Sequence, residues 1–397
     1  MKRMLLLLVT VLLLVGCTRA PSGTTIPTTH PKPAVYANNW AYRCLSADQQ
    51  QNYAAVYEAV VSGFANDTYT GITDGNKSET SLGLSVDLPV PLSNESEIQE
   101  LYDAVMQDNP AFFYVGSVYG YEGRQHGDER SFTALKLTYT MSAAERASAR
   151  TALESVRAEI VGAITPEMND FEKELALHDA LTARCRYDTA AAESSDPLGA
   201  YSASFTVYGA LVKGKAVCEG YARSMQYLLH AVGIEATVVA GFDKDGTPHM
   251  WNAVKPGGEL YYLDVTWNDT EKLNTYTYFN LNTEELQRSY TIDERAIGIE
   301  SATATAQNYY KKTNAYLDTL RIDELASYIA KALAEGECAH LQFTDNAYDN
   351  ALFFVRSTAW FVDTVNACRP EGASALSDYT FTYNETYKTV TICKKTS

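Results

Sequence analysis

The chain has 397 residues, of which 46% are hydrophobic, so it is long enough to form two or three domains with substantial cores. Acidic residues outnumber basic ones by 49 to 32, and the formal net charge is −17. This excess of negative charge disfavours nucleic acids and anionic lipid headgroups as partners. Basic peptides and cell-wall components remain compatible with it.

The first 17 residues have the pattern of a secretory signal. Lys2 and Arg3 precede an apolar run from Met4 to Val15, which is short for a membrane-spanning helix. The run ends in Leu14-Val15-Gly16-Cys17, which resembles a lipobox, the site where bacterial lipoproteins are cleaved and lipidated on the cysteine. We predict a lipid on Cys17 that anchors an extracytoplasmic protein to the bacterial cell membrane. An uncleaved anchor and an ordinary signal peptide are the alternatives.

Residues 18–40 are rich in Thr and Pro without an apolar period, which predicts a flexible tether. Residues 41–164 predict a small N-terminal α+β domain, in which the Thr-, Ser- and Gly-rich stretch 66–94 is weakly patterned. The predicted elements are helices at 47–65 and 95–106, strands at 112–118 and 132–140, and a helix from a capping box at 142–145 to residue 164. We find no candidate for chemistry in this domain.

Residues 165–295 predict the central domain, and residues 296–397 a C-terminal α+β module with an accessory role. In the central domain, a helix capped by Asp170 carries His178 and Cys185 on an apolar stripe, where core packing is their expected role. Further predicted elements are a strand at 236–241, helices at 284–288, 302–316, 323–334 and 347–366, a strand at 339–343 and a hairpin at 379–393.

The central domain contains a cysteine, a histidine and an aspartate, the residue types that acyl transfer uses as nucleophile, base and orienter. After the Gly214 loop, apolar residues recur at helical spacing from Cys218 onwards, and Gly233 supplies a stop. Cys218 is therefore predicted in the first turn of a buried helix. There the unpaired backbone N–H groups and the helix dipole favour a thiolate.

The histidine and the aspartate are predicted to meet on a hairpin. Residues 249–254 and 260–265 have strand character, with Lys255-Pro256-Gly257-Gly258 between them. If Pro256-Gly257 is the centre of the turn, His249 lies directly opposite Asp264. If Gly257-Gly258 is the centre, His249 pairs with Thr266, and Asp264 is its diagonal neighbour on the same face. A three-residue loop would place the two side chains on opposite faces.

Three segments together resemble the transglutaminase-like superfamily, in its compact bacterial branch, over about residues 165–290. They are Gly214–Arg223, His249–Asn252 and Asp264–Trp267. The resemblance implies a papain-like α+β core, in which a helix bearing the nucleophilic cysteine packs on an antiparallel sheet bearing histidine and aspartate. It implies that Cys218 is the nucleophile, His249 the general base and Asp264 the orienter of that base.

The predicted function is acyl transfer on protein or peptide amides, cell-wall peptides among them, through a thioester on the enzyme. Peptidase or amidase activity is slightly favoured, because water is always present as an acceptor. Cross-linking, as by a protein-glutamine γ-glutamyltransferase, is one alternative, and a non-catalytic cell-surface binding module is the other. We predict that the Cys218 N–H and the Tyr208 side chain hold the oxyanion, and that Trp251 and Trp267 flank the site.

No cofactor is expected, and no metal site, because the sequence has no CxxC pair and no HExxH. The run Asp243–Gly246 lacks the later ligands of an EF-hand and is predicted to be a turn. With Cys17 lipidated and Cys218 a free thiol, five cysteines remain, which argues against a full disulfide framework. One pair among Cys338, Cys368 and Cys393 is compatible with the sequence.

Overall fold

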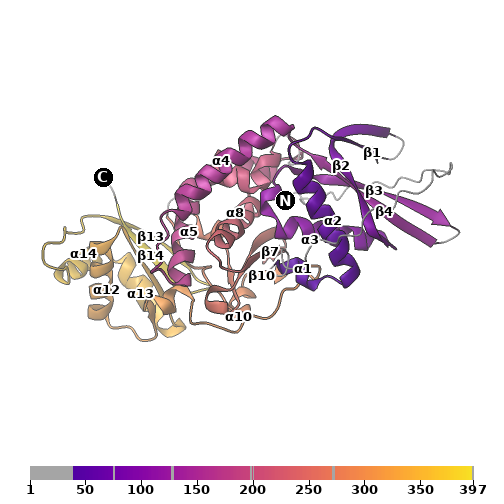
Figure 1. Ribbon diagram of the computed structural model, residues 1–397. Helices are drawn as coiled ribbons and strands as arrows, with labels where there is room; N and C mark the ends of the chain where they lie inside the picture. The colour runs from indigo at the N-terminus through magenta and orange to yellow at the C-terminus, as the bar shows by residue number, and fades with distance from the viewer. Residues whose placement is uncertain are drawn as a thin grey trace.

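The computed structural model describes residues 39–74, 77–126, 129–196, 199, 201–270 and 273–395. In these ranges the chain forms three four-stranded sheets and one two-stranded sheet. The first four-stranded sheet and the C-terminal unit lie at opposite ends of the molecule, with the central domain between them (Figure 1). The predicted signal peptide 1–17, with Cys17, and all but the last two residues of the predicted tether 18–40 lie outside the described residues.

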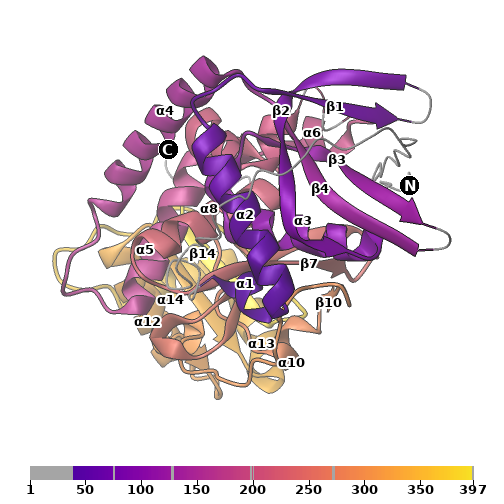
Figure 2. The same cartoon turned by 45° about the vertical axis from the view of Figure 1, so that its right-hand side comes forward.

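The N-terminal unit is a sheet covered by helices, and α2 lies beside β2 (Figure 2). The antiparallel strand order is β1-β2-β4-β3. Its elements are α1 (Trp40–Cys44), α2 (Ala47–Gly63), β1 (Tyr69–Asp74), β2 (Lys77–Leu92), α3 (Glu95–Asp108), η2 (Pro110–Phe112), β3 (Val115–His126), β4 (Glu129–Tyr139) and α4 (Ala143–Val161). The capping box of Ser142 and Glu145 at the start of α4 is confirmed.

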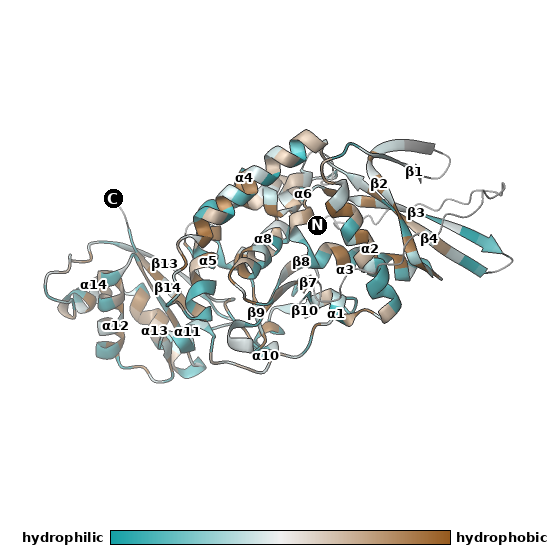
Figure 3. Cartoon of the chain, in the orientation of Figure 1, coloured by the Kyte–Doolittle hydropathy of each residue, from teal (hydrophilic) through white to brown (hydrophobic). Residues whose placement is uncertain are grey.

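Strands β1 and β2 occupy the stretch 66–94, for which the sequence analysis predicted no element. In β2 the side chains of Leu84, Val86 and Leu88 are buried at every second position, and Ser85 and Asp87 between them are exposed, which is the alternation of a half-buried strand that the sequence analysis missed. The exposed distal ends of β3 and β4 are hydrophilic (Figure 3).

The central domain packs a helix on an antiparallel sheet of order β10-β7-β8-β9. Helices α5 and α8 lie side by side in the middle of the molecule (Figure 1), and α8 contacts β7 and β8. This arrangement confirms the predicted α+β class with a helix on an antiparallel sheet. The elements are α5 (Asp170–Arg184), β5 (Arg186–Tyr187), α6 (Thr189–Glu193), η3 (Ser202–Phe205), η4 (Gly209–Lys213), β6 (Lys215–Ala216), α8 (Cys218–Ala231), β7 (Ala236–Asp243), β8 (Pro248–Val254), η5 (Pro256–Gly258), β9 (Tyr261–Leu263), α9 (Val265–Asn268), α10 (Thr283–Leu286) and β10 (Tyr290–Ile292).

Helix α5 begins one residue earlier than predicted, because Asn169 rather than Asp170 is its cap. The Asn169 side chain accepts a hydrogen bond from the N–H of Glu172, whose carboxylate bonds back to the cap. His178 and Cys185 are both fully buried, as the prediction of core packing requires. Gly233, with a φ of +82°, directly follows the last turn of α8, which confirms the predicted stop.

The connection between β8 and β9 is longer than either two-residue turn that was predicted. Asn252 pairs with Leu263 and Val254 with Tyr261, so six residues, 255–260, form the loop. The centre of this loop lies between Gly257 and Gly258, so the strands have the register of the Gly257-Gly258 alternative. A six-residue loop keeps the parity of a two-residue one, so the side chains face the sides that were predicted. The second strand is also shorter than predicted: β9 ends at Leu263, and Asp264 begins a short helix instead.

The C-terminal unit is a sheet of order β11-β12-β14-β13 with three longer helices. Its elements are α11 (Tyr309–Lys312), β11 (Tyr316–Leu317), α12 (Ile322–Glu335), β12 (Cys338–Phe343), α13 (Asp345–Arg356), α14 (Thr358–Ala367), β13 (Tyr379–Asn384) and β14 (Thr389–Lys394). Only α11 forms within the predicted helix 302–316. The predicted helix 347–366 is two helices, because the chain leaves helical geometry at Ser357 (φ −88°, ψ 71°).

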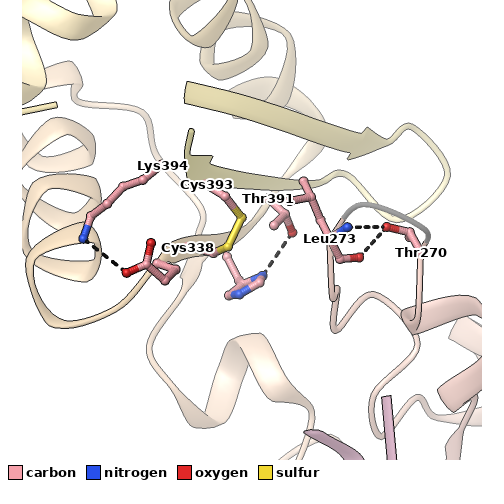
Figure 4. Close-up of a disulfide and its surroundings, with 8 residues drawn as sticks. Thr270, Leu273, Cys338, Thr391, Cys393 and Lys394 are labelled. Carbon is pink, nitrogen blue, oxygen red and sulfur yellow. Dashed lines mark hydrogen bonds and ion pairs between the residues drawn. A yellow bond between two sulfur atoms is a disulfide. The ribbon is translucent and has the colours of Figure 1, made fainter. Parts of the chain in front are cut away.

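A disulfide joins Cys338 of β12 to Cys393 of β14, which are paired residues of neighbouring strands (Figure 4). The expectation of one pair among the three C-terminal cysteines is therefore confirmed. Cys368 has a free thiol, as do Cys44, Cys185 and Cys218.

The buried side chains form one large cluster and two smaller ones. The large cluster is continuous in space and contains buried residues of both the N-terminal unit and the central domain, from Ala41 to Phe279 in the sequence. The C-terminal unit has a cluster of its own, from Leu325 to Ile392. The predicted domain boundaries at 164/165 and 295/296 stay predictions. In the described part of the chain, no helix is both long and apolar enough to cross a bilayer.

Candidate active site

Helix α8 presents Cys218 at its N-terminus. Cys218 is the first helical residue, and the preceding Val217 provides no side-chain cap, so the N–H groups of the first turn remain available to an anion. The start of the helix lies against the backbone of η3, because a Cβ on Gly220 would approach the carbonyl oxygen of Ser204 to 2.6 Å. Cys218 as a residue is partly exposed, unlike the fully buried Cys185.

Strand β8 presents His249, which lies opposite Gly241 of β7. Three residues further along the strand, the buried Asn252 donates hydrogen bonds to the carbonyl oxygens of Ala222 (2.8 Å) and Thr237 (3.2 Å). Asn252 therefore ties β8 to α8 and β7. The position of the histidine relative to the cysteine is set by a buried side chain rather than by a loop.

Asp264 stands where β9 ends and α9 begins. Its Oδ1 accepts a hydrogen bond from the N–H of Trp267 (3.1 Å), which caps α9. Its Oδ2 accepts from Nε2 of His249 at 2.7 Å, and the Asp264 side chain is only 2% exposed. Because Nε2 bonds the carboxylate, Nδ1 is the nitrogen that remains for the thiol.

The structure brings Cys218, His249 and Asp264 together. Burial by itself lowers the pKa of His249, but the charge and hydrogen bond of Asp264 and the hydrogen bond of Cys218 raise it to about 10. The imidazole therefore keeps its proton at neutral pH in this environment. A protonated imidazole beside a thiol at a helix N-terminus is the setting in which a thiolate is stabilised.

Both predicted tryptophans lie beside His249. The Trp267 ring centroid is 5.2 Å from that of His249, and Trp267 is partly exposed. The Trp251 centroid is 6.0 Å away with a nearly parallel ring, but Trp251 is 1% exposed. Trp267 can therefore border a bound substrate, whereas Trp251 supports the imidazole from within the core.

Tyr208 does not join this group, contrary to its prediction as an oxyanion donor. Its ring stacks on Phe113 of the N-terminal unit, with centroids 5.4 Å apart, and the Nζ of Lys213 lies 5.3 Å from its centroid. None of the contacts described for Tyr208 reaches Cys218 or His249. Tyr208 is the residue that precedes the π-helical turn η4, and its side chain makes no capping hydrogen bond there.

Tyr187 is a tyrosine near Cys218 that the sequence analysis did not single out. Strand β5 pairs with β6, so that Tyr187 is the partner of Ala216, two residues before Cys218. Burial and the nearby charges of Cys218, Asp264 and Asp188 raise the pKa of Tyr187 to about 12, while 44% of the residue stays exposed. Its hydroxyl is therefore protonated at neutral pH and able to donate. A two-residue strand has no periodicity, so the sequence held no signal for this neighbour.

Tyr290 is the second missed residue. It lies on β10, a three-residue strand that was not predicted, and its hydroxyl donates to Oδ2 of Asp264 at 2.7 Å. The spacing between Asp264 and Tyr290 belongs to no regular element, so only the folded chain reveals the contact.

Among the described residues, no group of three or more His, Cys, Asp and Glu side chains is arranged to hold a metal ion.

The family model of the transglutaminase-like superfamily matches residues 156–267, a range that includes Cys218, His249 and Asp264. No curated protein matches the chain. Among solved structures, the chain is similar to a TGase, at 14% identity and a TM-score of 0.28, over 48% of this chain and 52% of that one.

Two further similar structures are described as candidate proteases. The first is described as a candidate cysteine protease from Cytophaga hutchinsonii, at 14% identity and a TM-score of 0.23, over 37% of this chain and 61% of that one. The second is a protease from Parabacteroides distasonis ATCC 8503, at 13% identity and a TM-score of 0.23, over 38% and 36%. The chain thus spans less than two thirds of each of the three proteins.

Because all three TM-scores lie far below 0.5, we infer nothing about activity from these likenesses. The family match and the helix-on-sheet architecture agree on the same part of the chain. Residues 156–267 form a domain of the transglutaminase-like superfamily.

Proposed function

We propose that the protein is a cysteine-nucleophile acyl-transfer enzyme that acts on protein or peptide amides through a thioester. The observation that carries this proposal is the line of contacts from Cys218, a partly exposed residue, through the His249 ring to the buried carboxylate of Asp264. A cysteine that only filled the core would need neither a charged partner nor access to solvent.

In the proposed resting state the proton of the Cys218 thiol has already passed to Nδ1 of His249, so the reaction begins from a thiolate beside an imidazolium. The thiolate attacks the carbonyl carbon of the amide, and the C–N bond breaks as His249 returns the proton to the leaving amine. The acyl group is then a thioester on Cys218. Attack by water or by an amine, with His249 as base, releases the product and restores the thiolate beside the imidazolium. Asp264 holds the imidazole and stabilises its cation throughout.

For the oxyanion we propose the backbone N–H of Cys218 and the hydroxyl of Tyr187. The N–H belongs to the first residue of α8, and Tyr187 lies beside Cys218 on the exposed side of the site. These donors come from two different elements, so they can face one carbonyl oxygen from two directions.

Alkylation of Cys218 tests the proposal in the full chain. Because Cys44 is exposed and Cys368 partly exposed, both are first replaced by serine, and labelling by iodoacetamide is read by mass spectrometry on the peptide that contains Cys218, so that Cys17 does not contribute. We expect rapid labelling at pH 6, where an ordinary thiol is almost unreactive, and loss of that labelling in His249→Ala. Labelling that follows an ordinary thiol titration in both proteins would contradict the proposal.

The acceptor is tested with casein, in the presence and absence of a dansylated amine. We expect peptide release without incorporation of the amine, because water is always present at a partly exposed residue. Incorporation of the dansyl group into casein would instead identify the cross-linking reaction. If Cys218 is reactive but casein is unchanged in both arms, a broad protein substrate is excluded and peptides of the cell wall are the next candidates.

We propose further that a lipid on Cys17 holds the enzyme at the outer face of the bacterial membrane. The support is the lipobox-like run before Cys17 and the polar stretch that follows it. The full chain expressed in bacteria should incorporate a labelled fatty acid and sediment with membranes. Cys17→Ser should do neither, and incorporation of label into that variant would reject the site.

A further inference from the structure

We propose that Tyr290 is a positioning residue of the triad: its hydroxyl holds the Asp264 carboxylate, and through it the His249 ring, in the orientation that turns Nδ1 towards Cys218. The inference rests on the proposed function, because it assigns a role within the same site. It concerns a residue that lies outside the range matched by the family model.

The hydrogen bonds around Asp264 come from three different elements. Oδ2 accepts from His249 Nε2 and from the Tyr290 hydroxyl, both at 2.7 Å, while Oδ1 accepts from the N–H of Trp267 at 3.1 Å. With both oxygens bonded, the carboxylate has no freedom to rotate about its terminal bond. Tyr290 is the one of these donors that has no other part in the proposed chemistry.

The place of Tyr290 is set by sheet pairing and by close backbone approach. Residues 290–292 pair with 243–241 of β7, and Gly241 also lies opposite His249, so Tyr290 and His249 share one face of the sheet. A Cβ on Gly241 would come within 2.2 Å of the Thr291 carbonyl oxygen and 2.5 Å of the Trp251 ring. The absence of a side chain at Gly241 therefore allows β10 to lie close to the site.

The hydroxyl has a more specific role than filling space. Tyr290 is 3% exposed, and its ring is nearly parallel to that of His249, with centroids 5.8 Å apart. A phenylalanine would supply the same ring against His249 and Trp267. The hydroxyl adds a donor on the one oxygen that His249 uses, so the two donors share the negative charge of that oxygen.

This sharing predicts how the His249–Asp264 pair titrates. Five titratable groups lie near the His249–Asp264 pair. They are Cys218 of α8, Tyr187 of β5, Tyr290 of β10, and Tyr278 and Tyr387, which are neighbours of Tyr290. Of these, only Cys218 and Tyr290 hydrogen-bond the pair in the described structure. Removing the Tyr290 hydroxyl leaves more negative charge for the imidazolium, so His249 should hold its proton to a higher pH.

The test is the titration of His249 by NMR in the full chain labelled with 15N-histidine, with the signal assigned through His249→Ala. We expect Tyr290→Phe to raise the pH at which His249 loses its proton by about one unit, a tenfold change in proton affinity. The matched control is Tyr278→Phe, which removes a hydroxyl that accepts from Asn384 in the same aromatic cluster and should leave the titration unchanged. An unchanged titration in Tyr290→Phe would overturn the inference.

A second variant keeps the test decisive if Tyr290→Phe does not fold. Site-specific 3-fluorotyrosine at position 290 retains the ring and makes the hydroxyl a stronger donor, so His249 should lose its proton at a lower pH than in the wild type. A shift in the opposite direction, or none, would overturn the inference.

Alkylation of Cys218 separates this inference from the proposed function. If His249 responds to position 290 while the wild-type thiol reacts like an ordinary one, the proposed function fails and the role of Tyr290 in the His–Asp pair stands. If the thiol is activated but the titration of His249 is the same in the variants at position 290, the proposed function stands and Tyr290 contributes only packing.

Discussion

The two sides of the candidate active site are supported in different ways. The nucleophile side, helix α8, is held by the N-terminal unit: Arg223 and Gln226 donate to carbonyl oxygens at the end of α3, and Tyr227 donates to Glu154 of α4. These polar contacts sit at the border of one hydrophobic cluster that both regions share. The cysteine therefore belongs to the largest core of the protein.

The base side is supported by the C-terminal unit through tyrosines and other hydroxyl groups. Thr277 contacts Thr389 at 2.8 Å, Asn384 donates to the Tyr278 hydroxyl at 3.0 Å, and Tyr387 donates to the carbonyl of Glu285 at 3.0 Å. Tyr387 is the residue of that unit that enters the small cluster with Trp251 and Tyr290. Tyr309 of α11 stacks on Tyr276 of the central domain with ring centroids 4.0 Å apart, while most other apolar residues of the unit pack around a core and a disulfide of their own.

The N-terminal unit therefore shares a core with the nucleophile helix, whereas the C-terminal unit has a core of its own, and we expect that this unit can unfold while the triad persists. Five experiments can break or sharpen this contrast.

Asp264→Asn should have the largest effect, because it removes the charge that orients His249. We expect turnover to fall by on the order of 10⁴, while α9 keeps its cap because asparagine also caps helices. Peptide release from casein measures the rate, and circular dichroism checks the fold. A loss of less than tenfold would show that the base side does not depend on this carboxylate.

The His249–Asp264 pair should also make stability depend on pH. The pKa of His249 is raised from its ordinary value near 6.5 to about 10, so its contribution is complete below pH 6.5 and is lost as the pH rises towards 10. Urea unfolding at pH 6, 8 and 10 should show this decline in the wild type and a flatter response in Asp264→Asn. If the free energy of unfolding depends on pH in the same way in both proteins, the His249–Asp264 pair is not the source of the pH dependence.

Removing the Cys338–Cys393 disulfide, by replacing both cysteines with serine, should destabilise the C-terminal unit alone. The two cysteines are 55 positions apart in the sequence, and for a loop of this size the chain-entropy relation gives about 4 kcal/mol. Limited proteolysis of the double serine variant should cut first within residues 318–395, while the alkylation rate of Cys218 stays as it was. A parallel loss of alkylation would mean that the unit and the base side unfold together.

A pair of core substitutions compares the two supports directly. Leu101 of α3 and Ile329 of α12 are both fully buried, and truncation of either to alanine should cost about 3 kcal/mol. Leu101→Ala should lower the temperature at which Cys218 loses its reactivity, because Leu101 belongs to the shared cluster. Ile329→Ala should lower only a separate transition of the C-terminal unit. If both variants lose Cys218 reactivity at the same temperature, the two units support the active site equally.

Tyr387→Phe should have the smallest effect. It removes the hydrogen bond to Glu285 but keeps the ring against Tyr278, so a cost of about 1 kcal/mol is expected, with Cys218 alkylation unchanged. Tyr383→Phe, at a position 42% exposed, is the control and should cost nothing measurable by thermal unfolding. A larger effect on alkylation than on stability would make the C-terminal unit part of the active site.

Much of the site could be predicted because each of its main parts follows a local rule. The apolar spacing after Cys218 predicts a helix face, and Gly233 ends that helix. The alternation around His249 predicts a strand, and an even loop brings Asp264 to the same face whether it has two residues or six. The parity of the loop mattered, and its length did not.

The residues that were missed or misplaced lie on elements too short for any period. Tyr187 is on a strand of two residues and Tyr290 on one of three, and each is positioned by a partner strand distant in the sequence. Tyr208 has the composition of an oxyanion donor, but its ring stacks on Phe113, more than ninety residues earlier in the chain. No local pattern distinguishes these two kinds of tyrosine.

The sequence alone therefore determined which side chains could do the chemistry and which regular elements carry them, because helix and strand periods are properties of neighbouring residues. Only the tertiary structure decided which tyrosines surround the triad, which unit supports each side of it, and which nitrogen of His249 faces the thiol. Those outcomes depend on contacts between segments far apart in the chain, where packing and buried hydrogen bonds, rather than local preference, select one arrangement.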